Sequence, residues 1–67
     1  MSNENREKLW QINVAIHKQR IAVDSACLSV AAPAGAGPDF ALKQIEILKS
    51  LILDYKELKE EINKKDA

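Results

Sequence analysis

All the glycine and proline residues of this chain lie in one short stretch near its middle. They are Pro33, Gly35, Gly37 and Pro38. Glycine and proline are the residues least compatible with a helix interior, so this placement leaves a long uninterrupted segment on each side. A short connection between two helices favours an antiparallel arrangement. The sequence therefore predicts an all-α fold, a long antiparallel helical hairpin.

Capping preferences place the ends of the two expected helices. Ser2 or Asn3 can cap the first helix, and Glu4 with Lys8 forms a favourable four-residue pair in its opening turns. The residue before Pro33 is driven away from helical backbone angles, which ends that helix. We expect residues 1–67 to form a single domain made of a helix over about 3–31, a loop over 32–37 and a helix over about 38–64.

The second helix carries one broad apolar face. At about 100° per residue, its apolar side chains span roughly 160° of the circumference. A single neighbouring helix covers a narrower stripe, so this width predicts two neighbours. The face comprises Phe40, Ala41, Ile45, Ile47, Leu48, Leu51, Ile52, Tyr55, Leu58 and Ile62.

The first helix carries two apolar stripes whose centres lie roughly 140° apart around its axis. The stripe that we call the inner seam is Leu9, Ile12, Ile16, Gln19, Val23, Ala26 and Val30. The stripe that we call the outer stripe is Trp10, Val14, His17, Ile21 and Leu28. A helix with two separated apolar sides is expected to have a different neighbour on each side. Gln19 is a polar seam position of the kind that sets register in coiled coils.

Self-association is the expected source of a sufficient core. A chain of 67 residues buries little apolar surface alone, and its single Cys27 and single His17 supply neither an internal disulfide nor an ordinary zinc site. We therefore expect a dimeric four-helix bundle or a higher homo-oligomer, with no metal and no cofactor.

Charge and hydropathy narrow the classes of partner. The chain has 10 basic and 10 acidic residues, so it offers no basic face for nucleic acid. It has no long apolar run for a membrane span and no apolar segment of the secretory type near its start, and the mixed polar face of the second helix disfavours membrane attachment. A free cysteine in such a chain predicts a soluble protein in the cytoplasm.

An enzymatic function is disfavoured. Cys27 and His17 are ten residues apart on one helix, about 15 Å along its axis, so they cannot form a catalytic pair within one chain. We expect a non-enzymatic module for protein–protein interaction, such as an inhibitor, an adaptor or an assembly factor. The candidate partner-binding residues are Trp10, Val14, His17, Ile21, Leu28 and Phe40.

A second hypothesis is an oligomer that binds or sequesters a small anionic metabolite or nucleotide. Arginine in a partly dry setting recognises anions well, and glycines at a helix start expose backbone amides. Pro38 and Asp39 oppose a phosphate site, because one removes an amide and the other adds a negative charge. The candidate ligand-binding residues are Asn13, Arg20, Gly35 and Gly37.

Overall fold

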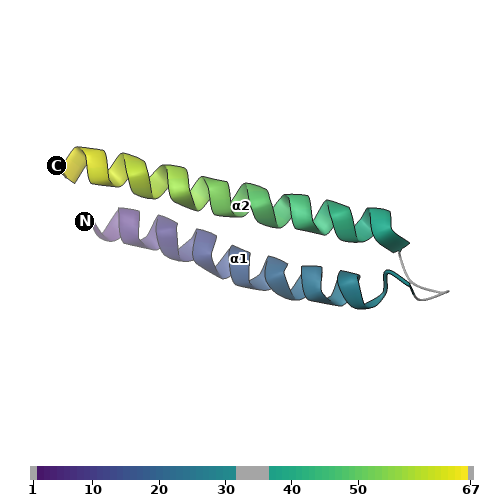
Figure 1. The fold of residues 1–67 in the computed structure, drawn as a ribbon. Helices are drawn as coiled ribbons and strands as arrows, with labels where there is room; N and C mark the ends of the chain where they lie inside the picture. The colour runs from purple at the N-terminus through teal and green to yellow at the C-terminus, as the bar shows by residue number, and fades with distance from the viewer. Residues whose placement is uncertain (1, 32–36, 67) are drawn as a thin grey trace.

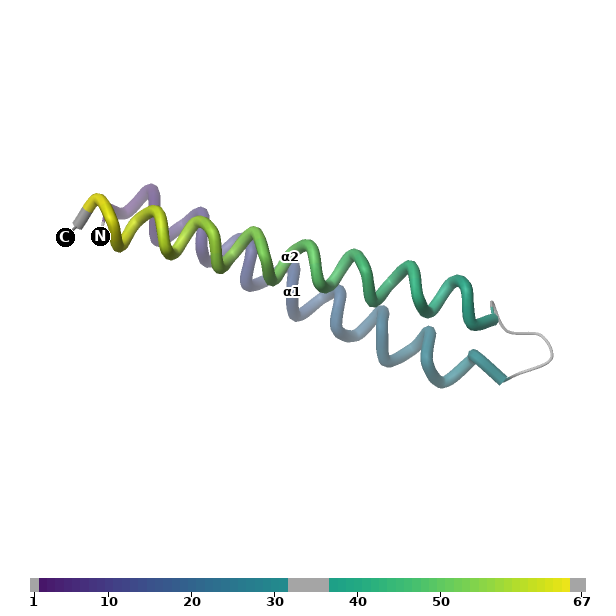
Figure 2. Tube along the Cα trace, turned by 45° about the horizontal axis from the view of Figure 1, so that its top comes forward, coloured from purple at the N-terminus to yellow at the C-terminus, as the bar shows by residue number. Residues whose placement is uncertain are grey.

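The computed structural model describes residues 2–31 and 37–66 of the chain. These residues form two helices, α1 (Asn3–Leu28) and α2 (Gly37–Asp66), which lie side by side and run antiparallel (Figure 1). The start of α1 and the end of α2 lie at the same end of a rod (Figure 2). The rod measures 53 × 16 × 10 Å, and its radius of gyration of 15.5 Å exceeds the about 11 Å typical of a compact chain of this length. The expected all-α hairpin is confirmed.

Ser2 caps the amino end of α1. Its hydroxyl oxygen accepts a hydrogen bond from the Asn5 backbone N–H at 3.1 Å, and its carbonyl oxygen accepts one from Arg6 at the same distance. These bonds satisfy amides that have no partner inside the helix. Glu4 and Lys8 form the expected ion pair, with 3.5 Å between Oε1 and Nζ.

α1 ends at Leu28, three residues before the end that the sequence predicted. The Ser29 hydroxyl donates to the Ala26 carbonyl at 3.0 Å, and the Ser29 backbone N–H donates to the same oxygen at 3.2 Å. The Val30 backbone N–H donates to the Cys27 carbonyl at 3.4 Å. These bonds to the third preceding residue replace α-helical ones, because a serine hydroxyl competes for the carbonyls of the last turn.

Gly37 begins α2 in a conformation that suits glycine. Its φ angle is +84°, in the left-handed region, and Pro38 and Asp39 follow in the first turn. A Cβ atom added at Gly37 would meet nothing within 4 Å. The position therefore selects glycine for its backbone angle and not for space.

The inner seam of α1 faces α2. Leu9 and Ala26 of this seam are buried, and every other member except Val30 is half-buried. The matching residues of α2 repeat with the same three- and four-residue spacing, which keeps one stripe of each helix against the other. They are Ala41, Gln44, Leu48, Leu51, Tyr55, Leu58 and Ile62, of which the first and last are buried and the others half-buried.

One polar layer interrupts this seam. The Gln19 side-chain amide Nε2 donates to the Gln44 side-chain oxygen Oε1 at 2.8 Å and to the Gln44 backbone carbonyl at 2.9 Å. A hydrogen bond between two half-buried amides is lost if either helix slides along the other. The pair thus defines the register of α1 against α2, as the sequence predicted for Gln19.

Replacing Gln19 alone should destabilise the fold more than replacing both glutamines. Gln19→Leu leaves the half-buried Gln44 amide without its partner, at a cost of about 1–2 kcal/mol in the free energy of unfolding. Gln19→Leu with Gln44→Leu forms an apolar layer and should recover most of that loss. Urea unfolding followed by circular dichroism, at one fixed protein concentration, measures the coupling. Additive effects of the two substitutions would contradict a Gln19–Gln44 interaction.

Gly37→Ala should lower the free energy of unfolding by about 1 kcal/mol, because an L side chain disfavours a φ angle of this sign. The matched control is Ser50→Ala, at an exposed position inside α2, which should be neutral or slightly stabilising. Thermal melting of the two variants beside the parent chain tests this difference. Equal melting temperatures for Gly37→Ala and the parent would show that the left-handed angle is unimportant.

Candidate interaction surface

The outer stripe of α1 lies on the side away from α2 and is largely open. The exposed fractions are 63% for Trp10, 69% for Ile21 and 87% for Leu28. His17 is also exposed, and Val14 is half-buried. The two stripes of α1 thus have different surroundings, because one packs in the hairpin and the other has no neighbour within the described chain.

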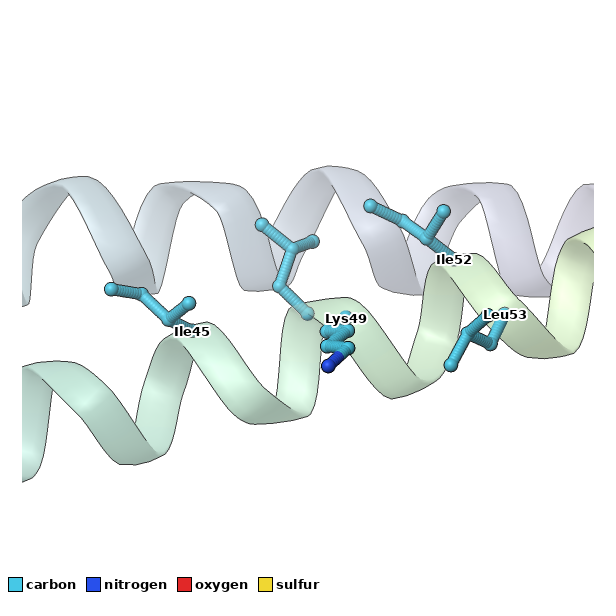
Figure 3. Close-up of a pocket in the computed structure, with 5 residues that line it drawn as sticks. Ile45, Lys49, Ile52 and Leu53 are labelled. Carbon is cyan, nitrogen blue, oxygen red and sulfur yellow. The ribbon is translucent and has the colours of Figure 1, made fainter.

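A second uncovered apolar area lies along one flank of α2. Ile45, Ile52 and Leu53 are exposed, and with Leu48 and Lys49 they line an open concavity of about 320 Å³. Ile45 and Ile52 point toward the α1 side of the helix, whereas Lys49 points away from it (Figure 3). The wide apolar face of α2 therefore extends well beyond the stripe that α1 covers.

Phe40 lies on the opposite flank of α2 from this concavity, on the same edge as Ile47. Both side chains are exposed. With the antiparallel register set by Gln19 and Gln44, this edge of α2 borders the edge of α1 that carries Ala15 and Ala22, two half-buried small residues. Phe40 is therefore accessible to a partner, but it is not part of the outer stripe.

The polar candidates do not converge on one site within the described chain. Asn13 and Arg20 are both exposed on α1, seven residues or about 10 Å apart along its axis. From Arg20 to the end of α1 at Leu28 is another eight residues, or about 12 Å along the helix axis. Gly37 begins α2, and Gly35 lies outside the described residues.

Residues that carry chemistry are dispersed over the surface. Cys27 is a free, exposed thiol, and His17 is exposed ten residues earlier on the same helix. Within residues 2–31 and 37–66, no three His, Cys, Asp or Glu side chains come together in a way that could hold a metal ion. Neither described helix combines the length and the apolar character that crossing a bilayer requires.

The roles of two residues, Gln44 and Leu53, were not predicted from the sequence. Gln44 belongs to the helix contact, and its place three residues after Ala41 and four before Leu48 is the signal that could have identified it. Leu53 interrupts the polar side of α2, where residue spacing alone indicates an isolated exposed leucine. It lines the concavity because Ile52, Lys49 and Leu48 flank it on the helix surface.

Comparison of the chain with protein-family models, with curated proteins and with solved structures finds no match. The two uncovered apolar surfaces are therefore the features of the described residues that bear on function.

Proposed function

We propose that this chain is a small, non-enzymatic module for protein–protein interaction that works as a homo-oligomeric helical bundle, most simply a dimer of hairpins. The observation that carries the proposal is the exposure of large apolar side chains on two separate surfaces, the outer stripe of α1 and the concave flank of α2. Exposed apolar patches of this kind typically mark protein contacts. One surface serves the second copy, and the other remains for a different protein.

The energy of burial supports association. Fully burying a large apolar side chain contributes roughly 1.5–3 kcal/mol. Burying the remaining surface of eight of the exposed large apolar side chains, whose exposed fractions range from 37% to 87%, would contribute on the order of 10 kcal/mol before the costs of association and ordering. A single hairpin has few fully buried residues, so this gain is large relative to its own core.

The concavity on α2 suits a protein partner better than a substrate. Its lining consists of four aliphatic side chains and the stem of Lys49, and it offers no nucleophile and no acid–base pair. An inhibitor, an adaptor or an assembly factor of this design would present the rigid helix face to an apolar segment of its partner, without a metal or a cofactor. The exposed thiol of Cys27 fits a reducing compartment such as the cytoplasm.

The proposal predicts a solution mass of at least twice the 7.5 kDa of one chain. Static light scattering at low micromolar concentration measures this mass directly. Dilution should shift the emission of the only tryptophan, Trp10, toward that of a solvated indole, because its exposed face becomes covered on assembly. A well-folded chain with the mass of a monomer and unchanged Trp10 emission would contradict the oligomeric bundle.

A separate variant tests the role of the α2 concavity. Ile52→Lys places a charge in the concavity, whereas the matched control Ser50→Lys places the same charge at an exposed polar position two residues away. In affinity capture with the tagged chain followed by mass spectrometry, partners of this surface should be lost with Ile52→Lys and retained with Ser50→Lys. Equal capture by both variants would exclude the concavity as the partner site.

A further inference from the structure

We propose that the outer stripe of α1 packs against the same stripe of a second copy, antiparallel, with Ile21 on the twofold axis. This inference rests on the proposed self-association and specifies which surface mediates it and in what register. The exposure of the stripe, the spacing of its residues and the placement of its two polar members support it.

The outer stripe is part of a complete heptad pattern. Adding Asp24 gives a set with strictly alternating four- and three-residue steps, which we call the outer heptad. Its members are Trp10, Val14, His17, Ile21, Asp24 and Leu28, all exposed except the half-buried Val14. This is the same spacing that the inner seam uses to pack against α2, so the outer heptad has the geometry of a second helix–helix contact.

The outer heptad is complementary to itself in one antiparallel register. A twofold axis at Ile21 brings residues whose numbers sum to 41 or 42 to the same level. The hairpin implies the same alternation: the numbers of Gln19 and Gln44 sum to 63, and those of the next seam positions, Ile16 and Leu48, sum to 64. The dimer layers are Ile21 with the partner's Ile21, Val14 with the partner's Leu28, and His17 with the partner's Asp24; Trp10 lies at the outer end of the contact, beyond the partner's Leu28.

The two polar residues of the outer heptad decide between registers. In the register centred on Ile21, each His17 imidazole N–H can donate to the carboxylate of Asp24 of the partner subunit, so neither polar group faces an apolar side chain. A shift of one heptad in either direction brings the two copies of His17, or the two copies of Asp24, together on the axis. A parallel pairing brings the two copies of His17 together and also the two copies of Asp24. Such like-with-like pairs, and a carboxylate against an apolar residue, oppose association.

The edges of this contact are compatible with the same register. The two copies of Arg20 approach each other near the axis, and each lies four residues before an Asp24 on its own helix, so two carboxylates offset the two guanidinium groups. Cys27 lies seven residues from the Arg20 level. The two Cys27 thiols are then about 20 Å apart along the axis and cannot form a disulfide with each other.

The uncovered flank of α2 lacks this self-complementarity. Along it, Ile45 and Ile52 alternate with the exposed Lys49, Lys56 and Lys59, whereas the acidic Glu46 and Glu60 lie further round the helix, in the heptad position of Leu53. Pairing this flank with its own copy brings lysines together or places them against apolar residues. The second copy therefore belongs on α1, and the flank of α2 remains available to a partner with acidic groups beside an apolar segment.

A charge exchange across the proposed interface tests the register. Asp24→Lys places a cation opposite His17, and His17→Glu places a carboxylate opposite Asp24; each should raise the dimer dissociation constant at least tenfold in sedimentation equilibrium. Combining both substitutions restores opposite charges and should return the constant to within about threefold of the parent. The control Ser50→Lys, on α2, should leave it unchanged. Failure of the combined variant to recover would overturn the pairing of His17 with Asp24.

Cysteine cross-linking tests the same register without altering charge. In a Cys27→Ser background, Ile21→Cys alone should form a covalent dimer with oxidised glutathione, and Val14→Cys alone should not. A mixture of Val14→Cys and Leu28→Cys chains should again cross-link. A dimeric parent whose Ile21→Cys variant stays uncross-linked would overturn this inference and leave self-association intact. A monomeric parent would contradict both this inference and the proposed oligomer.

Discussion

The contact between the inner seam of α1 and the matching stripe of α2 holds the structure together. It is a regular three–four repeat on both helices, so two long helices stay in contact along their length without a connecting sheet or a disulfide. Its apolar layers resemble one another, and such layers alone would tolerate sliding by one heptad. The single Gln19–Gln44 layer removes that freedom, since two side-chain amides in a half-buried position must meet each other.

The register has consequences for both surfaces of the molecule. Once α1 and α2 are aligned, the outer stripe of α1 has to face away from the hairpin, and the aliphatic residues beside the α2 stripe have to form an open flank. Both surfaces follow from helices whose apolar arcs are wider than one neighbour can cover. The hairpin formed by residues 2–31 and 37–66 leaves this additional apolar width uncovered.

Much of the fold follows from local chemistry that the sequence displays. The Ser2 cap is a local effect that appears in the structure as predicted, and α2 begins at Gly37, one residue before the predicted start, while residues 32–36 of the predicted loop lie outside the described residues. The earlier end of α1 depends on a competition between the Ser29 hydroxyl and the helical hydrogen bonds, which residue types alone do not resolve. The contribution of Gln44 requires knowing which face of α2 meets Gln19, and this is a tertiary property.

The candidate surfaces were predictable to different degrees. The separation of the two stripes on α1 was evident from spacing, but only packing shows that the inner seam is the one covered by α2. Once that assignment is made, the polar residues of the outer heptad gain meaning. A histidine and an aspartate on an exposed helix face are unremarkable in isolation, yet their symmetric placement about Ile21 matches a twofold interface, because each then meets its opposite type. The lysines on the α2 flank lie beside Ile45 and Ile52, and the nearest acids, Glu46 and Glu60, lie further round the helix, so that surface is better suited to a chemically different partner.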